Sequence, residues 1–580
     1  MRFVYLIFLV LFSMYSVFSQ EQRWVDAETY GSGSLYFMEP DGYGNFILIG
    51  EFGMQIENQI FRFPDINKAS LGADDVALIK VDSNFKVIAY NYLSSSSNIR
   101  LNSMVISSEE CFISYTTVKE VFTKEGSFLP SSELARTITC FDKNLNLLWS
   151  KEMIDSLDCI TRSLAFCGVM GDKAIVAGSI HGFDVQQPSA TLDSTLIRSP
   201  DMQGRAYYFL IDSAGYISDL TYIGKHDDPY ISSIKRYDED VYYNIKGLRE
   251  RVIINEELVY TGPIVPRYGS STSLVKMDTA SNVEWLQLVD LDGWGQVGIS
   301  AMDVDSTENV LLAVGYSSIN SPPHDNPDRL YIGDSFIARE NRSVDESSNV
   351  ALARLNSKGE VQWLKKLWSY GGRLGVSTVI CKSPNHYLVF GYSSEQLIYD
   401  GDTLISTYSV GRTAFILELD SIGNKISFEM LGGNGSTFSA KMLLEKNGDL
   451  VIAGNTYSGR VAFGDVSIEP EDVTDPSTFF NFYIARKSIR TRGSIPKKNI
   501  YNDISLYPNP ASGYIQVDFQ QDSGAKELYI YDALAREILY QRADEDNLVV
   551  DVRGLASGSY IVNIVTTEGS YIKKLLITRW

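Results

Sequence analysis

Hydrophobic and polar positions alternate over short stretches along most of the chain, a pattern typical of β-strands. One apolar stretch that closes on glycine recurs at intervals of 63 to 76 residues: Phe46–Gly50, Ala174–Gly178, Tyr243–Gly247, Leu311–Gly315, Tyr387–Gly391 and Leu450–Gly454. Cys111–Ser114 takes the remaining place in the series, with serine where glycine is expected. Seven copies on one period indicate a repeat architecture.

A second strand follows each copy and in six repeats closes on Asp or Asn: Leu78–Asp82, Ile138–Asp142, Tyr208–Asp212, Leu274–Asp278, Leu352–Asn356 and Ile416–Asp420. An Asp or Asn side chain can accept a hydrogen bond from the backbone two residues on, which predicts a turn. After the turn comes a strand that often carries Trp, and another strand opens the next repeat. Four strands per repeat predict an all-β, seven-bladed β-propeller.

The seventh repeat lacks the strand that should follow Phe482–Lys487. The stretch around Trp24 lies as far ahead of Met38 as the equivalent strands lie ahead of the other repeats. We therefore expect the mature N-terminal strand to complete the last blade and close the ring, which removes exposed sheet edges. The alternative is an open solenoid of about seven sheet repeats.

The two ends of the chain predict separate segments. Residues 1–19 combine Arg2 with an apolar run from Phe3 to Phe18, which predicts a cleaved signal peptide; a membrane anchor is the alternative, although the run is short for one. No later run is long enough to span a membrane, so we expect none in the mature chain. We assign the propeller to 20–487 and a basic linker to 488–503. The charged linker is either simply solvated or a joint that proteases can reach. Alternating residues in 504–580 predict a small β-sandwich.

Composition narrows the classes of partner. The chain of 580 residues has 51 Lys plus Arg against 72 Asp plus Glu, a net charge of −21, so we expect no nucleic-acid partner. Five Cys and four His favour neither a disulfide framework nor a His-based metal site. The sequence also lacks a phosphate-binding glycine loop with Lys and the common hydrolase motifs.

An ordered set of motifs near the C-terminus is distinctive. Its members are Tyr507, Pro508, Asn509, Pro510, Gly513, Asp532, Gly558, Tyr560, Lys573 and Lys574. This set resembles the type A C-terminal sorting domain of type IX secretion substrates, and the repeats resemble the propeller regions often found ahead of such domains. The resemblance implies export through the signal peptide, translocation by the type IX machinery guided by 504–580, and a secreted or surface-attached product.

Three segments between predicted blades combine acids with aromatic or His residues. The candidate binding-face residues are His226, Asp227, Asp228, Tyr230, Asp290, Asp292, Trp294, His324 and Asp325. An aromatic ring can stack on a sugar, and carboxylates suit Ca²⁺. Solvated loops without a ligand are the alternative. Apart from Ca²⁺, no cofactor is expected.

Two functions remain open from the sequence. The favoured one is a non-catalytic binding module for a polysaccharide or protein ligand, because no catalytic motif is found. The alternative is a polysaccharide hydrolase or lyase whose carboxylates come from different blades.

Overall fold

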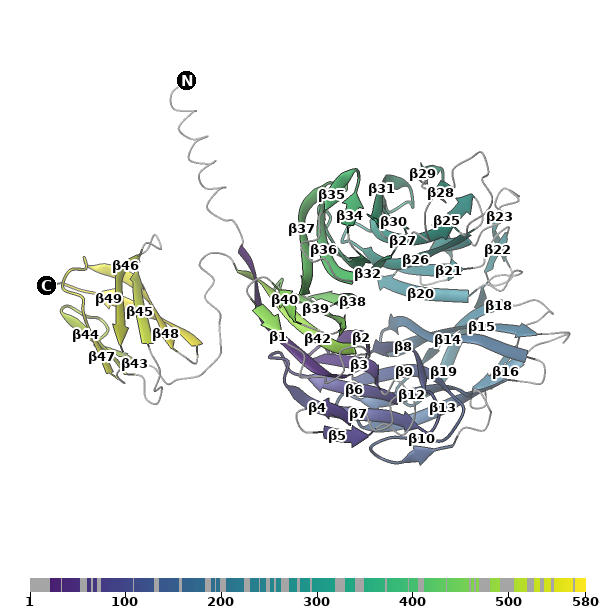
Figure 1. The fold of residues 1–580 in the computed structure, drawn as a ribbon, viewed down its shortest axis with the longest axis horizontal. Coiled ribbons are helices and arrows are strands. Elements are labelled where there is room, and N and C mark those ends of the chain that lie inside the picture. Colours follow the sequence, from purple (N-terminus) through teal and green to yellow (C-terminus); the bar gives the residue numbers. More distant parts are fainter. Residues whose placement is uncertain are drawn as a thin grey trace, which may run out of the picture. The chain divides into compact units, whose positions relative to one another are not determined.

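The computed structural model is all-β, with no helix among the residues that it describes (Figure 1). In that part of the chain, accordingly, no helix could cross a membrane. The chain divides into two compact units, Trp24–Ser488 and a second that takes in Met1–Arg23 and Ile489–Trp580. The structure describes residues 21–579 except 33, 53–59, 64–65, 70–74, 108, 130–134, 156–158, 183–188, 193–194, 199–204, 224–229, 239, 247–250, 255–256, 262–270, 279–281, 293–294, 319–328, 339–348, 371–372, 395, 405–411, 434–435, 458–459, 464–465, 469–479, 491–504, 519–525, 533–536, 544–546 and 567–568.

The described part of Trp24–Ser488 contains seven antiparallel sheets, numbered here along the chain, and a separate hairpin of β4 (Ile60–Phe63) and β5 (Ile66–Ala69). Sheet 1 has the spatial order β2 (Ser34–Pro40), β3 (Phe46–Phe52), β6 (Asp75–Val81), β7 (Val87–Ser95), β10 (Val121–Phe122), β11 (Ser127–Phe128). Sheet 2 has β8 (Arg100–Ile106), β9 (Glu110–Thr117), β12 (Ala135–Asp142), β13 (Leu147–Asp155), β16 (Ser189–Leu192), β17 (Thr195–Arg198). Sheet 3 has β14 (Cys159–Met170), β15 (Lys173–Gly182), β18 (Arg205–Ile211), β19 (Ile217–Ile223), β22 (Arg251–Ile254), β23 (Glu257–Thr261).

The remaining four sheets follow the same order. Sheet 4 has β20 (Tyr230–Tyr237), β21 (Asp240–Lys246), β24 (Ser271–Met277), β25 (Val283–Asp292), β28 (Arg329–Ile332), β29 (Ser335–Ala338). Sheet 5 has β26 (Gly295–Val304), β27 (Val310–Ser318), β30 (Asn349–Leu355), β31 (Val361–Tyr370), β34 (Gln396–Tyr399), β35 (Asp402–Leu404). Sheet 6 has β32 (Leu374–Ser383), β33 (His386–Ser394), β36 (Arg412–Asp420), β37 (Lys425–Gly433), β40 (Val461–Phe463), β41 (Val466–Ile468). Sheet 7 has β38 (Ser436–Leu444), β39 (Leu450–Tyr457), β42 (Phe480–Arg490), β1 (Glu21–Ser32).

The last two strands of sheets 1 to 6 are a hairpin from the next repeat. The hairpin β28–β29, for example, lies between β27 and β30 in the sequence, yet β28 pairs with β25 of sheet 4. In that pairing Val289 lies opposite Ile332 and Leu291 opposite Leu330, and all four side chains are buried. Each such hairpin therefore ties one sheet to the repeat that follows it.

The first strands of the seven sheets contact one another in chain order, and β38 of sheet 7 contacts β2 of sheet 1. Buried apolar side chains fill the space between each pair of neighbouring sheets. Between sheets 7 and 1 this core contains Phe482 and Ile484 together with Met38 and Leu48. At the other edge of sheet 7, β1 lies next to β42, where the sequence predicted the N-terminal strand.

The glycine of the second strand has a physical cause at Gly50, Gly391 and Gly454, where an added Cβ atom would lie within 2.5 Å of a carbonyl oxygen of the first strand. Each first strand carries a β-bulge at the same place, as between Leu35 and Phe37 in β2. The bulge brings the backbone of the first strand against the second. A Cβ atom on Gly50 would lie 2.5 Å from the carbonyl oxygen of Ser34, so this position has no room for a side chain.

The predicted Asp turns are confirmed. In the turn after β12, Asp142 Oδ1 accepts hydrogen bonds from the backbone N–H groups of Asn144 and Asn146, both at 2.8 Å. The same pattern follows β6, β18, β30 and β36. The Asp or Asn side chain therefore fixes the turn that starts the fourth strand.

The Trp residues of the fourth strands connect neighbouring repeats. Trp285 donates a hydrogen bond through Nε1 to the carbonyl oxygen of Ser357, at 2.9 Å, in the turn of the next repeat. Gly359 in that turn has φ of +79°, and a Cβ atom there would lie 2.7 Å from the indole ring. Trp149 and Trp363 donate in the same way to Ser213 and Ser421.

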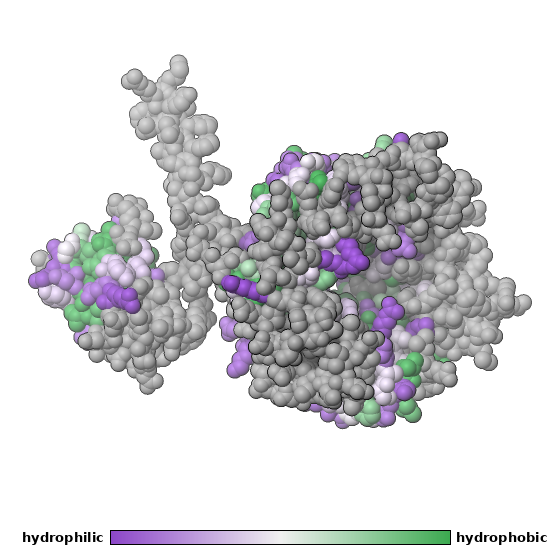
Figure 2. All heavy atoms as spheres, in the orientation of Figure 1, coloured by the Kyte–Doolittle hydropathy of each residue, from purple (hydrophilic) through white to green (hydrophobic). Residues whose placement is uncertain are grey.

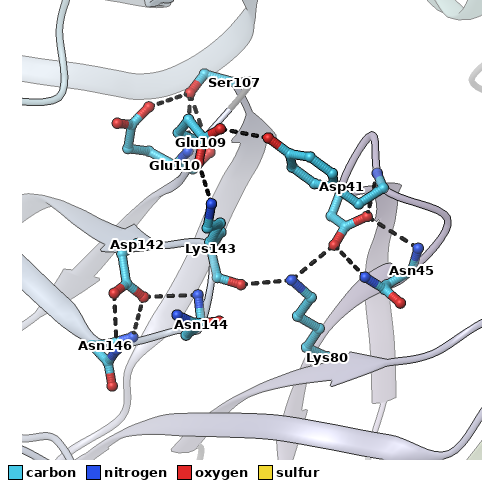
Figure 3. Close-up of polar contacts among 11 residues, drawn as sticks. Asp41, Asn45, Lys80, Ser107, Glu109, Glu110, Asp142, Lys143, Asn144 and Asn146 are labelled. Carbon is cyan, nitrogen blue, oxygen red and sulfur yellow. Dashed lines mark hydrogen bonds and ion pairs between the residues drawn. The ribbon is translucent and has the colours of Figure 1, made fainter.

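A polar network joins sheets 1 and 2 beside these turns (Figure 3). Lys80 contacts Asp41 at 2.8 Å and donates to the carbonyl oxygen of Lys143 at 2.7 Å. The side chain of Lys143 pairs with Glu109 at 2.9 Å, and the Tyr43 hydroxyl donates to Glu109 at 2.5 Å. Burial alone would raise the pKa of Asp41, but hydrogen bonds, first among them that from Lys80, lower it. The network therefore links two repeats through groups that are charged at neutral pH.

The described part of the second unit is a two-sheet β-sandwich. One sheet has the order β43 (Ser505–Tyr507), β44 (Tyr514–Asp518), β47 (Asn547–Asp551), and the other β46 (Glu537–Ala543), β45 (Lys526–Tyr531), β48 (Gly558–Thr566), β49 (Gly569–Ile577). Their inner faces share a core that includes Ile515, Val550, Ile530 and Val562. Figure 2 shows hydrophobic residues on the surface of this unit among hydrophilic ones; the exposed apolar side chains include those of Ile538, Tyr540, Val549, Ile561 and Leu576.

Candidate functional site

Two predicted binding residues lie within a strand and not in a loop. Asp290 and Asp292 belong to β25, where Asp290 pairs with Ser271 on one side and Tyr331 on the other. The strand continues this far because Val289 and Leu291 alternate with the acids and are buried. The Asp290 side chain is itself buried and accepts a hydrogen bond from the backbone N–H of Leu291 at 2.9 Å. The expectation that these acids lie in a loop is therefore corrected.

Most of the other predicted binding residues lie outside the described residues: His226, Asp227, Asp228, Trp294, His324 and Asp325. Tyr230 is the first residue of β20. Their role, and a Ca²⁺ site made from them, stay predictions. Within the described ranges, no group of three or more His, Cys, Asp and Glu side chains could hold a metal ion.

A cavity of about 330 Å³ opens at the first strands of sheets 5 and 6. Its walls include Lys246, Gln296, Ser300, Tyr316, Asn349 and Leu374. The volume is at the lower end of the range for small-molecule sites, about 300–1,000 Å³. Lysine, amide and hydroxyl groups in one cavity suit a ligand with several hydrogen-bonding groups.

The cavity lies at the end of the sheets from which the long segments between second and third strands emerge. Lys246 ends β21, Asn349 begins β30 and Leu374 begins β32, so three sheets contribute to one wall. The sequence did not predict this cavity, because its walls come from residues more than a hundred positions apart.

Lys246 crosses from sheet 4 to the first strand of sheet 5. A Cβ atom on Gly298 would lie 2.9 Å from Lys246 Cε and 3.1 Å from its Nζ. The ammonium group therefore lies directly over the Gly298 backbone, and the missing side chain leaves space for it. The only sequence signal for this arrangement is Gly298 in a first strand, where glycine is unfavourable without a close approach.

In the C-terminal unit, Asn509 connects the motif to the last strand. Its Nδ2 donates to the carbonyl oxygen of Lys574 at 2.6 Å, and its Oδ1 accepts from the N–H of Leu576 at 2.9 Å. Two residues on, Ala511 exchanges backbone hydrogen bonds with Leu576 and Thr578. Pro508 and Pro510, which flank Asn509, both follow cis peptide bonds.

The other motif residues take separate places in this unit. The carbonyl oxygen of Gly513 accepts from Val552, and the Tyr560 hydroxyl donates to the carbonyl oxygen of Ala556 at 3.0 Å. Tyr507 is exposed at the end of β43. The remaining members lie along the second sheet: Asp532 directly after β45, Gly558 at the start of β48, and Lys573 and Lys574 in β49.

Comparison with known families identifies the second unit. Residues 505–578 match the family described as the secretion system C-terminal sorting domain. The chain thus carries the sorting domain of a type IX secretion substrate, and the prediction made from the motifs is confirmed. A domain of this kind sends its protein to the cell surface or outside the cell.

The other comparisons add no family. No curated protein matches the chain. Among solved structures, the chain is similar to PorZ of Porphyromonas gingivalis, described as an essential bacterial surface component of the type IX secretion system, at 9% identity over 96% of this chain and 100% of that one, with a TM-score of 0.17. It is also similar to the extracellular domain of BT4673 of B. thetaiotaomicron, at 10% identity over 97% and 98%, with a TM-score of 0.19. Scores this low establish no common fold, and nothing below rests on them.

Proposed function

We propose that the protein is a secreted or surface-attached, non-catalytic binding module: a seven-bladed β-propeller with a ligand site in the cavity at the first strands of sheets 5 and 6. The cavity carries the proposal. It combines a volume suited to a small ligand group with amide, hydroxyl and ammonium groups from three sheets.

Several observations support the closed propeller. The first three strands of all seven sheets follow one order, the first strands contact in sequence, and apolar cores lie between every neighbouring pair, including sheets 7 and 1. The seam between these two sheets also has polar contacts: Lys441 pairs with Glu39 at 2.7 Å, and Asn455 makes two hydrogen bonds to the Leu35 backbone. An open solenoid would leave these groups without their partners.

The proposed division of the chain is a signal peptide in 1–19, the propeller in 20–487, a basic linker in 488–503 and the sorting domain in 504–580. We propose that the sorting domain meets the type IX machinery through the outer face of its four-stranded sheet. Exposed apolar side chains there include Ile538, Tyr540, Ile561 and Leu576. Apolar residues gathered on a surface are typical of interaction sites.

The experiment is retention of the secreted protein on a panel of immobilised polysaccharides, with the soluble fraction analysed for cleavage products. Gln296→Ala removes an exposed side chain from the cavity wall and should reduce retention without changing stability. Gln362→Ala is the matched control, since Gln362 is exposed on β31 outside the cavity. Equal retention of the two variants would contradict the cavity as the binding site, and cleavage products would favour the hydrolase or lyase.

A further inference from the structure

The cavity wall carries a positive charge in an acidic protein. Among the described residues that line it, Lys246 is the charged one, whereas the whole chain has a net charge of −21. Its ammonium group lies over Gly298, which places the charge at the wall of the cavity. A cation at the wall of a cavity favours an anionic ligand group.

Two arginines extend the positive region beyond the β32 wall. Gly375 lines the cavity, and a Cβ atom there would lie 2.6 Å from the ring of Tyr392 on β33. The guanidinium group of Arg412 lies 5.5 Å from the centre of that ring and 4.8 Å from the centre of the Phe438 ring. Arg373 immediately precedes the cavity-lining Leu374. These two guanidinium groups and two aromatic rings lie at the same end of sheet 6 as the cavity, but on the face of β32 and β33 that is turned towards sheet 7.

The two arginines are close enough to affect each other. Burial, and then the positive charge of Arg373, lower the pKa of Arg412. Like charges held together are costly unless an anion compensates them, and a guanidinium group binds a carboxylate through two parallel hydrogen bonds. The Tyr392 and Phe438 rings hold Arg412 in place by cation–π contact.

The neutral groups of the cavity distinguish between kinds of anion. Gln296, Ser300, Ser317 and Asn349 present amide and hydroxyl groups, which can both donate and accept hydrogen bonds. Ligand hydroxyl groups need partners of this kind. We propose that the cavity and the adjoining Arg373–Arg412 surface bind an acidic saccharide, with a uronate carboxylate on the cationic groups and sugar hydroxyls on the amides and hydroxyls. This inference rests on the proposed function, since it names the ligand class of the same site.

The test measures binding of the full secreted chain by titration calorimetry. The three probes have equal length: hexagalacturonate, a neutral galactose hexamer and hexaglutamate. We expect the uronate to bind at least about tenfold more tightly than either of the others, because a hydrogen bond to a charged group contributes about 1.5–3 kcal/mol and 1.4 kcal/mol is tenfold. Raising the salt concentration from about 0.05 to 0.5 M should weaken its binding.

Three variants test whether uronate binding depends on the cavity. Lys246→Gln should weaken uronate binding about tenfold. Gly298→Ala keeps every charge but displaces the end of the flexible Lys246 side chain, so it should also weaken binding while the thermal unfolding temperature stays unchanged. Lys86→Gln, at an exposed turn on the opposite end of the sheets, is the control and should have no effect.

The outcomes separate the two proposals. If the neutral hexamer binds as tightly as the uronate and Gln296→Ala still weakens it, the acidic class is wrong and the cavity remains the site. Tighter binding of hexaglutamate would replace the saccharide by an acidic peptide. Uronate binding that is absent, or that neither Lys246→Gln nor Gly298→Ala changes, overturns the inference. The proposed function itself is overturned by the polysaccharide panel, through unchanged retention of Gln296→Ala or through cleavage products.

Discussion

The seam between sheets 7 and 1 gives the sharpest test of a closed ring. Asn455 on β39 accepts a hydrogen bond from the Leu35 N–H at 2.6 Å and donates one to the Leu35 carbonyl oxygen at 3.0 Å. These two residues lie at opposite ends of the repeat region. Asn455→Ala removes both hydrogen bonds and leaves the bulged backbone of β2 without its partner.

The expected loss follows from the burial of Leu35, which is 2% exposed. A buried backbone donor or acceptor left without a partner costs about 1–3 kcal/mol, so two such groups cost about 2–6 kcal/mol. Asn455 is only partly buried, and water that enters from its side lowers the cost. We therefore expect a free energy of unfolding lower by about 2 kcal/mol, at the low end of the range.

Equilibrium unfolding in urea, followed by Trp fluorescence on the full chain, measures this change. Asn282→Ala is the matched control, because the Asn282 side chain is exposed and, among the described residues, bonds to Asp278 of its own turn. We expect the control to change stability by no more than about 0.5 kcal/mol. Equal urea midpoints for the two variants would refute the closed ring, because in an open solenoid Asn455 would lie at a free end.

Three further predictions test individual contacts. Trp285→Phe keeps an aromatic ring but loses the hydrogen bond to Ser357, so the free energy of unfolding in urea should fall by about 0.5–1.5 kcal/mol; no change would mean that water replaces the bond. The side chain of His386, with its Nε2 3.5 Å from Glu418 Oε2, lowers the pKa of Glu418 to about 2. This contribution to stability is complete above the unfolded-state pKa near 4.5 and is lost as the pH falls towards 2, so urea unfolding between pH 6 and 3 should show a shallower acid dependence in Glu418→Gln. Asn509→Ala removes both hydrogen bonds to β49 and should reduce the amount of protein in the culture medium relative to the cell fraction. Unchanged secretion would mean that Asn509 is not needed for sorting.

The repeats could be predicted from the sequence because their causes are local. The Asp of the turn acts within a few residues, as Asp142 shows, and the glycine acts against the neighbouring strand of the same repeat, as Gly50 shows. The sorting motif was also visible, through its resemblance to a known domain, although Asn509 itself bonds to the last strand. These features leave the same letters at the same spacing in each copy, and a single sequence is enough to find them.

Contacts between repeats leave no such trace. The hairpins at the outer edges carry no local sign that they join the preceding sheet. The cavity depends on Lys246, Gln296 and Asn349, which belong to three sheets and share no local pattern. Reasoning from local composition instead selected acidic segments such as that of Asp290, whose alternation with buried apolar residues places it in a strand.

The hairpins also predict where the proposed ring would open first. Sheets 1 to 6 each gain two strands from the following repeat, whereas among the described residues sheet 7 ends at β1, and the hairpin β4–β5 of sheet 1 pairs only with itself. The seam therefore depends on inner contacts, such as those of Asn455 and the bond from Arg486 to the Ser83 carbonyl at 2.5 Å. We expect amide hydrogen exchange in β2 and β42 to be faster than in β26 and β30, because local opening follows the weakest set of contacts. Equal protection of the two pairs of strands would contradict this, since it would mean that the apolar core between sheets 7 and 1 compensates for the missing hairpin.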